Sequence, residues 1–246
     1  MEDIVIITDR LTKRFGDFIA ANEISLQVHK GEIFGFLGAN GAGKTTAMRM
    51  LCGLSKPSSG NATIAGFDVY KDTEQIKKRI GYMSQKFSLY EDLTVIENIR
   101  FFAGIYGLSD HEIREKSERL ISQLDLKHEA KSLVSALPLG WRQKLAFSVA
   151  VIHEPKIVFL DEPTGGVDPV TRRQFWDMIY EAADRGMTVF VTTHYMDEAE
   201  YCNRISIMVD GKVQALDTPG NLKKKFQVDS MDEVFYQLAR NARRSD

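Results

Sequence analysis

Apolar residues along the chain fall mostly into short, continuous runs that are too short to be amphipathic helices. Such runs, rich in Val, Ile and Phe, are typical of strands that are buried on both faces of a parallel sheet. They occupy 4–8, 24–28, 33–37, 61–66, 79–85, 157–160, 188–193 and 204–209. The pattern predicts an α/β chain with a mixed sheet core.

The stretch from about 91 to 153 has a different, helical pattern. Apolar residues recur at i, i+4, i+7 and i+11 from Val95 to Tyr106, a second amphipathic segment covers 110–124, and a third begins at Gln143. This spacing places the apolar side chains on one face of a helix. Because no strand candidate interrupts the stretch, we expect an inserted helical subdomain.

The C-terminal part of the sequence predicts a hairpin followed by helices. Asp210-Gly211 is a hairpin turn signal, and the residues after it carry three lysines at 223–225 and a helix-like run from Met231. We therefore divide the chain into a main domain over 1–220, with the helical subdomain inside it, and a helical tail over 221–246.

Composition excludes several classes of protein. With 43% hydrophobic and 27% charged residues in 246, the chain resembles an ordinary globular protein. A net charge of −2 argues against broad electrostatic capture of nucleic acid. Cys52 and Cys202 lie among apolar neighbours and indicate buried thiols in a reducing compartment. The first residues are acidic and lack a long apolar run, so we expect no secretory signal there, and no apolar stretch reaches the roughly 20 residues of a membrane helix. We expect no direct insertion into a membrane.

A glycine-rich motif follows the predicted strand at 33–37 and precedes a predicted helix at 44–53. It fits the P-loop pattern G-x-x-x-x-G-K-[ST], whose backbone amides and helix N-terminus attract phosphate oxygens. In this pattern Lys44 reaches the β- and γ-phosphates of a nucleotide, and Thr45 is a ligand of Mg²⁺. The candidate binding residues are Gly38, Ala39, Asn40, Gly41, Ala42, Gly43, Lys44, Thr45 and Thr46.

Two acids end the apolar run at 157–160. Asp161 lies where a carboxylate holds Mg²⁺ in P-loop proteins, and Glu162 could polarise an attacking water. Alone, the pair could equally be a solvated acidic turn. The P-loop elsewhere in the chain favours the chemical interpretation.

With these motifs in place, the whole chain resembles the nucleotide-binding subunit of an ABC transporter, in the drug-exporter branch typified by daunorubicin-exporter ATPases. The resemblance implies a P-loop NTPase fold, the binding of ATP and Mg²⁺, and four further site residues. They are Phe15 as the aromatic platform for adenine, Gln85 of the Q-loop as a ligand of Mg²⁺ and catalytic residue, Asp168 of the D-loop, and His194 as the switch histidine. Each of these residues taken alone is weak evidence for the family. Their order around two phosphate motifs supports the interpretation.

The segment LPLGWRQ, residues 137–143, lies where this family carries its signature LSGGQ. Leu137 and Gly140 match, whereas Pro138, Leu139 and Trp141 replace the serine, the first glycine and the glutamine. In the family this helix start contacts the γ-phosphate bound by the opposite subunit. The resemblance therefore implies phosphate binding in trans around Gly140, without the serine hydroxyl.

The resemblance implies an ATP-hydrolysing subunit on the cytoplasmic face of a membrane. It would pair with a second ATPase subunit, as a homodimer or as half of a heterodimer, and drive integral-membrane permease subunits that export a drug. No nucleic acid partner is expected. Two alternatives stay open: a soluble ABC-type ATPase without a transport role, and a module that binds ATP but hydrolyses it poorly because of the altered signature.

Overall fold

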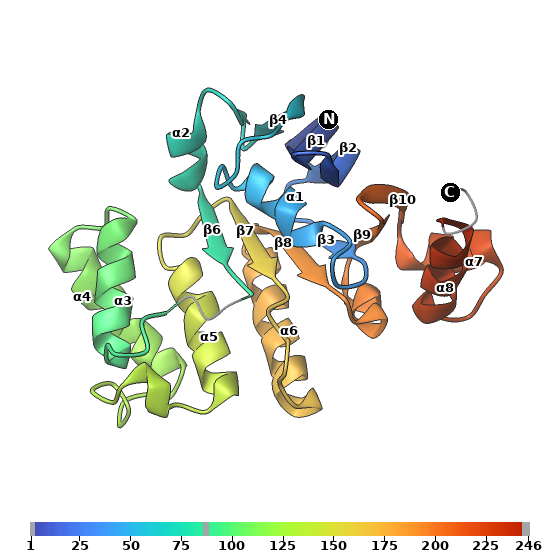
Figure 1. The fold of residues 1–246 in the computed structure, drawn as a ribbon. Coiled ribbons are helices and arrows are strands. Elements are labelled where there is room, and N and C mark those ends of the chain that lie inside the picture. The colour runs from blue at the N-terminus through green and yellow to red at the C-terminus, as the bar shows by residue number, and fades with distance from the viewer. Residues whose placement is uncertain (1–2, 86–88, 243–246) are drawn as a thin grey trace.

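The computed structural model describes residues 3–85 and 89–242. Its core is a six-stranded sheet (Figure 1) in the order β10-β9-β3-β8-β7-β6. Five strands are parallel, and β10 turns back at Asp210-Gly211 to pair antiparallel with β9. The strands are β3 (Ile33–Leu37), β6 (Ile80–Met83), β7 (Ile157–Asp161), β8 (Thr188–Thr193), β9 (Arg204–Val209) and β10 (Lys212–Asp217). The mixed sheet and the hairpin turn are confirmed.

A second, antiparallel sheet has the order β2-β1-β4-β5. Its strands are β1 (Ile4–Phe15), β2 (Phe18–His29), β4 (Ser59–Ile64) and β5 (Phe67–Asp68). The sequence prediction made β1 and β2 far too short. Both strands continue through polar residues because they form one long hairpin, interrupted by register shifts, whose residues alternate between the core and solvent.

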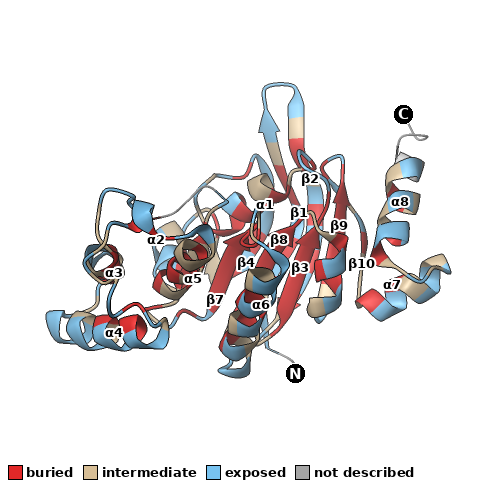
Figure 2. Ribbon diagram, turned by 90° about the horizontal axis from the view of Figure 1, so that it is seen from below, coloured by how far each residue is buried: buried red, intermediate tan, exposed pale blue. Residues whose placement is uncertain are grey.

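The six-stranded sheet is covered on both faces, as its apolar runs require. Alternate residues point to opposite sides, so Phe159 packs with α1 (Lys44–Leu51) and the second sheet, whereas Val158 and Leu160 pack with α5 (Leu139–Ala150) and α6 (Pro169–Asp184). Figure 2 shows the strands as the most continuously buried part of the fold.

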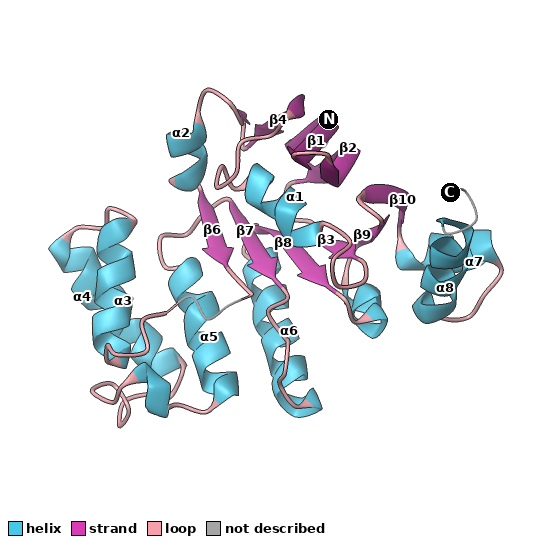
Figure 3. Cartoon of the chain, viewed as in Figure 1, coloured by secondary structure: helices cyan, strands magenta, loops and turns pink. Residues whose placement is uncertain are grey.

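The predicted helical stretch is confirmed by α3 (Val95–Ile105), α4 (Asp110–Gln123), η1 (Val134–Ala136) and α5, which lie at one end of the sheet (Figure 3). Capping boxes begin both α3 and α4. Helix α5 begins four residues before the predicted Gln143, with Pro138 as its N-cap. The apolar periodicity misses this first turn because Leu139 is exposed and Trp141 is half-buried.

The remaining helices are α2 (Thr73–Lys77), η2 (Met196–Tyr201), α7 (Pro219–Phe226) and α8 (Met231–Ala242). Apolar residues of α8, including Val234 and Leu238, join the core beside β9 and η2. The predicted boundary after residue 220 falls inside α7, and the division into domain and tail stays a prediction. Within the described ranges, no helix has the length and hydropathy to cross a bilayer.

Cys52 and Cys202 are free and buried, as predicted. Burial raises the pKa of both thiols well above the usual value. They therefore stay protonated and act as small apolar side chains.

Candidate active site

The P-loop closes tightly between β3 and α1. Gly43 is the N-cap of α1 with φ 100°, and no side chain caps the helix. A Cβ at Gly43 would overlap the carbonyl oxygen of Ala20, and one at Gly38 would overlap that of Met208. Both positions therefore need glycine, and the first amides of α1 have no acceptor within the helix. This is the geometry in which a helix N-terminus binds phosphate.

Lys44 is almost fully buried below this loop. Its Nζ donates hydrogen bonds to the carbonyl oxygens of Gly38 (2.8 Å) and Ala39 (3.1 Å) and lies 3.2 Å from Glu162 Oε1. A buried ammonium needs such partners. The loop thus holds a positive charge under the position where phosphates would bind.

Asp161 lies at the carboxyl end of β7. Its Oδ1 accepts hydrogen bonds from Thr192 Oγ1 (2.6 Å) and Thr45 Oγ1 (3.1 Å). Burial raises the pKa of this carboxyl group, and the two hydroxyl donors partly oppose that change. A carboxylate and a hydroxyl oxygen 3.1 Å apart are hard ligands of the kind Mg²⁺ prefers. Both residues therefore fit the predicted Mg²⁺ site.

Glu162 is the point at which the predicted catalytic residues meet. Its Oε2 accepts a hydrogen bond from Gln85 Nε2 at 3.0 Å and lies 2.9 Å from His194 Nδ1, while Oε1 faces Lys44. Gln85 follows β6, Glu162 follows β7 and His194 follows β8, so the carboxyl ends of three neighbouring parallel strands bring them together. Glu162 adopts φ 48°, a conformation uncommon outside glycine and enriched at functional sites.

A cavity of about 230 Å³ opens beside these residues. Its lining consists of Phe18, Ala20, Asn40, Gly41, Gly43, Lys44, Thr45, Thr46, Gln85 and Glu162. Phe18 and Ala20 were missed by sequence reasoning; the turn between two β-like runs was the available signal. Phe15, the predicted platform, pairs with Phe18 across the hairpin but does not line the cavity.

Two other predicted residues, Asp168 and Gly140, lie at the N-termini of α6 and α5, outside the lining of this cavity. The Asp168 carboxylate caps α6 by accepting hydrogen bonds from the backbone of Val170 and Thr171. A Cβ at Gly140 would press on the Thr171 methyl group. The signature segment and the D-loop therefore meet each other and not the P-loop of their own chain.

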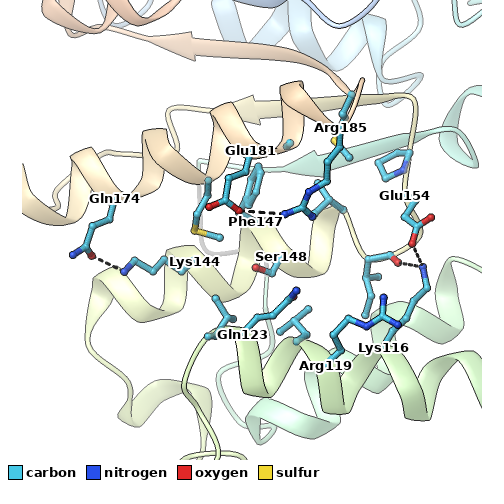
Figure 4. Close-up of a pocket in the computed structure, with 18 of the residues that line it drawn as sticks. Lys116, Arg119, Gln123, Lys144, Phe147, Ser148, Glu154, Gln174, Glu181 and Arg185 are labelled. Carbon is cyan, nitrogen blue, oxygen red and sulfur yellow. Dashed lines mark hydrogen bonds and ion pairs between the residues drawn. The ribbon is translucent and has the colours of Figure 1, made fainter.

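A larger cavity of about 820 Å³ lies elsewhere, between α4, α5 and α6 (Figure 4). Phe147 and Ser148 line it together with several basic side chains, which include Lys116 and Lys144. No residue predicted for the active site is among its lining, so we assign it no part in the chemistry above.

A P-loop between β3 and α1, with two carboxylates at the carboxyl end of β7 in the same sheet, defines a nucleotide-binding P-loop ATPase domain. The profile of the ABC transporter family matches residues 21–165, and the chain belongs to this family as one of its ATP-binding domains.

Among known proteins, the chain is 48% identical over 241 residues to the probable multidrug ABC transporter ATP-binding protein YbhF of Escherichia coli, covering 96% of this chain and 42% of that protein. It thus spans about two fifths of that relative. It is 34% identical to the linearmycin resistance ATP-binding protein LnrL of Bacillus subtilis, over 92% of this chain and 73% of that protein.

Solved structures agree with the fold assignment. An ATP-binding subunit of an ABC transporter superposes with a TM-score of 0.85 at 26% identity, over 95% of this chain and 99% of that one. A dimeric ATP-binding cassette in a post-hydrolysis state, bound to ADP and inorganic phosphate, gives a TM-score of 0.78 at 26% identity, over 87% and 98% of the two chains. The predicted family and fold are confirmed.

The aromatic pair at the hairpin tip allows a direct test of nucleotide stacking. Both rings are exposed, and an aromatic contact is worth about 0.5–1.5 kcal/mol beyond burial. We expect Phe15→Ala and Phe18→Ala each to raise the KM for ATP by a few-fold to tenfold, with little change in kcat. Steady-state kinetics measure both. A raised KM in Phe18→Ala alone would move the adenine platform from Phe15 to Phe18.

Proposed function

We propose that the chain is the ATP-hydrolysing subunit of a membrane exporter that removes drug-like compounds, and that it acts on the cytoplasmic face. The observation that carries hydrolysis is the convergence of Gln85, His194 and Lys44 on Glu162 beside the P-loop. Export is supported by the relatives named for multidrug transport and linearmycin resistance.

In this proposal the amides at the start of α1 and Lys44 bind the phosphates, and Thr45, Asp161 and Gln85 hold Mg²⁺, which would screen the phosphate charge. When nucleotide binds, Lys44 exchanges its contacts with the loop carbonyls for phosphate oxygens. Glu162 is then free to orient a water molecule, and His194 holds the carboxylate in place from the other side. Geometry supports these roles for Thr45 and Asp161, which lie 3.1 Å apart, and for Gln85, His194 and Lys44, which each lie within 3.2 Å of Glu162.

The second half of each site comes, in this proposal, from another ATPase subunit. Gly140 and Asp168 lie outside the lining of the cavity of their own chain, which is consistent with a role across a dimer interface. We propose a homodimer, with a heterodimer as the alternative. The solved relative that forms a dimer after hydrolysis supports the former arrangement.

Coupling to a permease requires a docking surface, which we place on the segment after Gln85 and on α3. Residues 86–88 of this segment lie outside the described ranges. The sequence KFSLYEDLTV (86–95) predicts exposed apolar residues for this contact, Leu89 among them. Leu89 is instead buried, so a charge there would damage the core and would not test docking. In the described part of this surface, the exposed large apolar side chains are Tyr90, Phe101 and Ile105, and the Tyr90 and Phe101 rings touch edge to face at 5.1 Å.

Tyr90→Glu tests this assignment. A charge at an apolar contact costs desolvation energy. We therefore expect the variant to lose co-purification with its integral-membrane permease, while basal ATPase activity stays unchanged. Tyr236→Glu is the matched control, since Tyr236 is also an exposed tyrosine (65% against 49% for Tyr90) but lies on α8 at the opposite end of the sheet.

If Tyr90→Glu still co-purifies with the membrane protein, the docking surface does not include Tyr90. An active wild-type ATPase that binds no membrane protein would instead favour an ATPase without a transport role.

A further inference from the structure

A buried polar cluster lies behind the active site, between the start of α6 and the loop that carries His194. Glu198 of η2 is fully buried, and its Oε1 accepts a 2.6 Å hydrogen bond from Thr164 Oγ1. Thr164 follows Glu162 by two residues, and Glu198 follows His194 by four. The bond therefore ties together the two segments whose side chains meet at the candidate base.

Arg172 of α6 joins the same cluster. Its guanidinium lies 4.1 Å from the ring centre of Tyr195, and its Nε lies 3.7 Å from Glu198 Oε1. The Tyr195 ring in turn lies 4.1 Å from the His194 ring. A line of contacts thus runs from α6 through Tyr195 to His194.

This cluster is incompletely bonded in the structure. Arg172 Nε and Glu198 Oε2 are buried atoms without a hydrogen-bond partner. N–H···O bonds form at about 2.7–3.2 Å, so the 3.7 Å between Arg172 Nε and Glu198 Oε1 is about half an ångström too long for one. Unmet buried polar groups are unfavourable, so a small approach of α6 towards the His194 loop would be stabilising.

We propose that Thr164, Arg172 and Glu198 are positioning residues for ATP hydrolysis. They hold His194 against Glu162 and transmit movement of the α6 N-terminus to that contact. Asp168 caps this N-terminus, and Gly140 of α5 packs beside it. The inference rests on the proposed hydrolysis at Glu162 and extends it to residues that touch neither nucleotide nor water.

The test compares Thr164→Val, which keeps the shape and removes the hydroxyl, with Thr164→Ser, which restores the donor. Misplacing a reacting group by about 1 Å can cost a hundredfold in rate. We expect Thr164→Val to lower kcat about tenfold or more, with the KM for ATP changed less than about twofold, and Thr164→Ser to rescue kcat. Arg172→Gln should lower kcat in the same way, and it carries the test should Thr164→Val fail to fold.

The control is Arg185→Gln, a basic residue of the same helical region whose ion pair with Glu181 is exposed. It should leave kcat unchanged. A second readout is the NMR signal of the His194 ring nitrogens in the nucleotide-free chain, which should shift in Thr164→Val and Arg172→Gln but not in Arg185→Gln.

Wild-type kcat together with an unshifted His194 signal in both cluster variants would overturn the inference. That result would not contradict the proposed function, provided that Glu162→Gln is inactive. A wild-type chain that hydrolyses no ATP would instead contradict the proposed function, and the His194 signal would still decide the positioning role.

Discussion

Glu162→Gln should abolish turnover and leave ATP binding intact. Gln85, His194 and Lys44 all contact this carboxylate, and removing a general base costs about 100- to 10,000-fold in rate. Glutamine keeps the size of the side chain and one acceptor oxygen. We therefore expect kcat to fall by about 100-fold or more while the Kd for ATP changes only a few-fold, and an ATP-bound dimer to accumulate. Phosphate release, equilibrium binding and size-exclusion chromatography measure the three quantities.

Lys44→Ala provides the contrasting variant. Lys44 would contact phosphate through charge-assisted hydrogen bonds, so its loss should weaken ATP binding itself. It also removes the cation 3.2 Å from Glu162 Oε1, which leaves that buried carboxylate less well compensated. If Glu162→Gln hydrolysed ATP at the wild-type rate, the assignment of the base would be wrong, whatever Lys44→Ala does.

The sequence predicted those parts of the site in which local chemistry and position in the chain coincide. The P-loop glycines are an example, since Gly43 must avoid the carbonyl oxygen of Ala20 and no other residue type can do so. The family resemblance implied Gln85 and His194 as site residues beside Glu162, and they meet because parallel neighbouring strands place their carboxyl ends at one edge. The order of the strands, however, was not predicted from the sequence.

What the sequence did not predict depends on tertiary contacts. Phe18 and Phe15 have the same character and lie on one hairpin, and only the packing of β2 beside the P-loop places Phe18 at the cavity. Leu89 lies in a segment rich in apolar residues at the edge of the helical subdomain, and its sequence does not distinguish an exposed docking residue from one that packs in the core, where Leu89 lies. The sequence does not indicate that Glu198 is buried either, since an acid in a short helical turn is ordinarily solvated.

The LPLGWRQ segment leads to a prediction in which packing and phosphate contact can be separated. A Cβ at Gly140 would press on Thr171, so any substitution there disturbs the contact between α5 and α6 before its charge matters. Gly140→Asp adds a carboxylate that would repel the γ-phosphate of the opposite subunit. We expect this variant to lose turnover by about 100-fold or more, because the added carboxylate opposes the stabilisation of developing charge, and the loss of a single donor of that kind already costs about 100-fold.

Thr171→Ser removes the methyl group that a Cβ at Gly140 would touch and keeps the hydroxyl that bonds Asp168. Combined with Gly140→Ala, it should restore most of the turnover that Gly140→Ala loses, because that loss is steric. Combined with Gly140→Asp, it should restore almost none, because the carboxylate remains. Steady-state ATPase assays of the four variants separate the two causes, and full rescue of Gly140→Asp would show that Gly140 serves packing alone.

Pro138 stands where the family signature has serine. A hydroxyl bonded to a charged phosphate is worth about 1.5–3 kcal/mol, or roughly ten- to a hundredfold in rate. The start of α5 keeps its free amides whether or not that hydroxyl is present, and a helix N-terminus binds anions without it. Pro138→Ser should therefore change kcat by no more than about a hundredfold, and the wild-type chain should hydrolyse ATP by itself.

If the chain is inactive until Pro138-Leu139 is changed to Ser-Gly, or until a partner with an intact signature is added, the homodimer is excluded. The chain is then the degenerate half of a heterodimer, in which the partner supplies the signature that completes the working site.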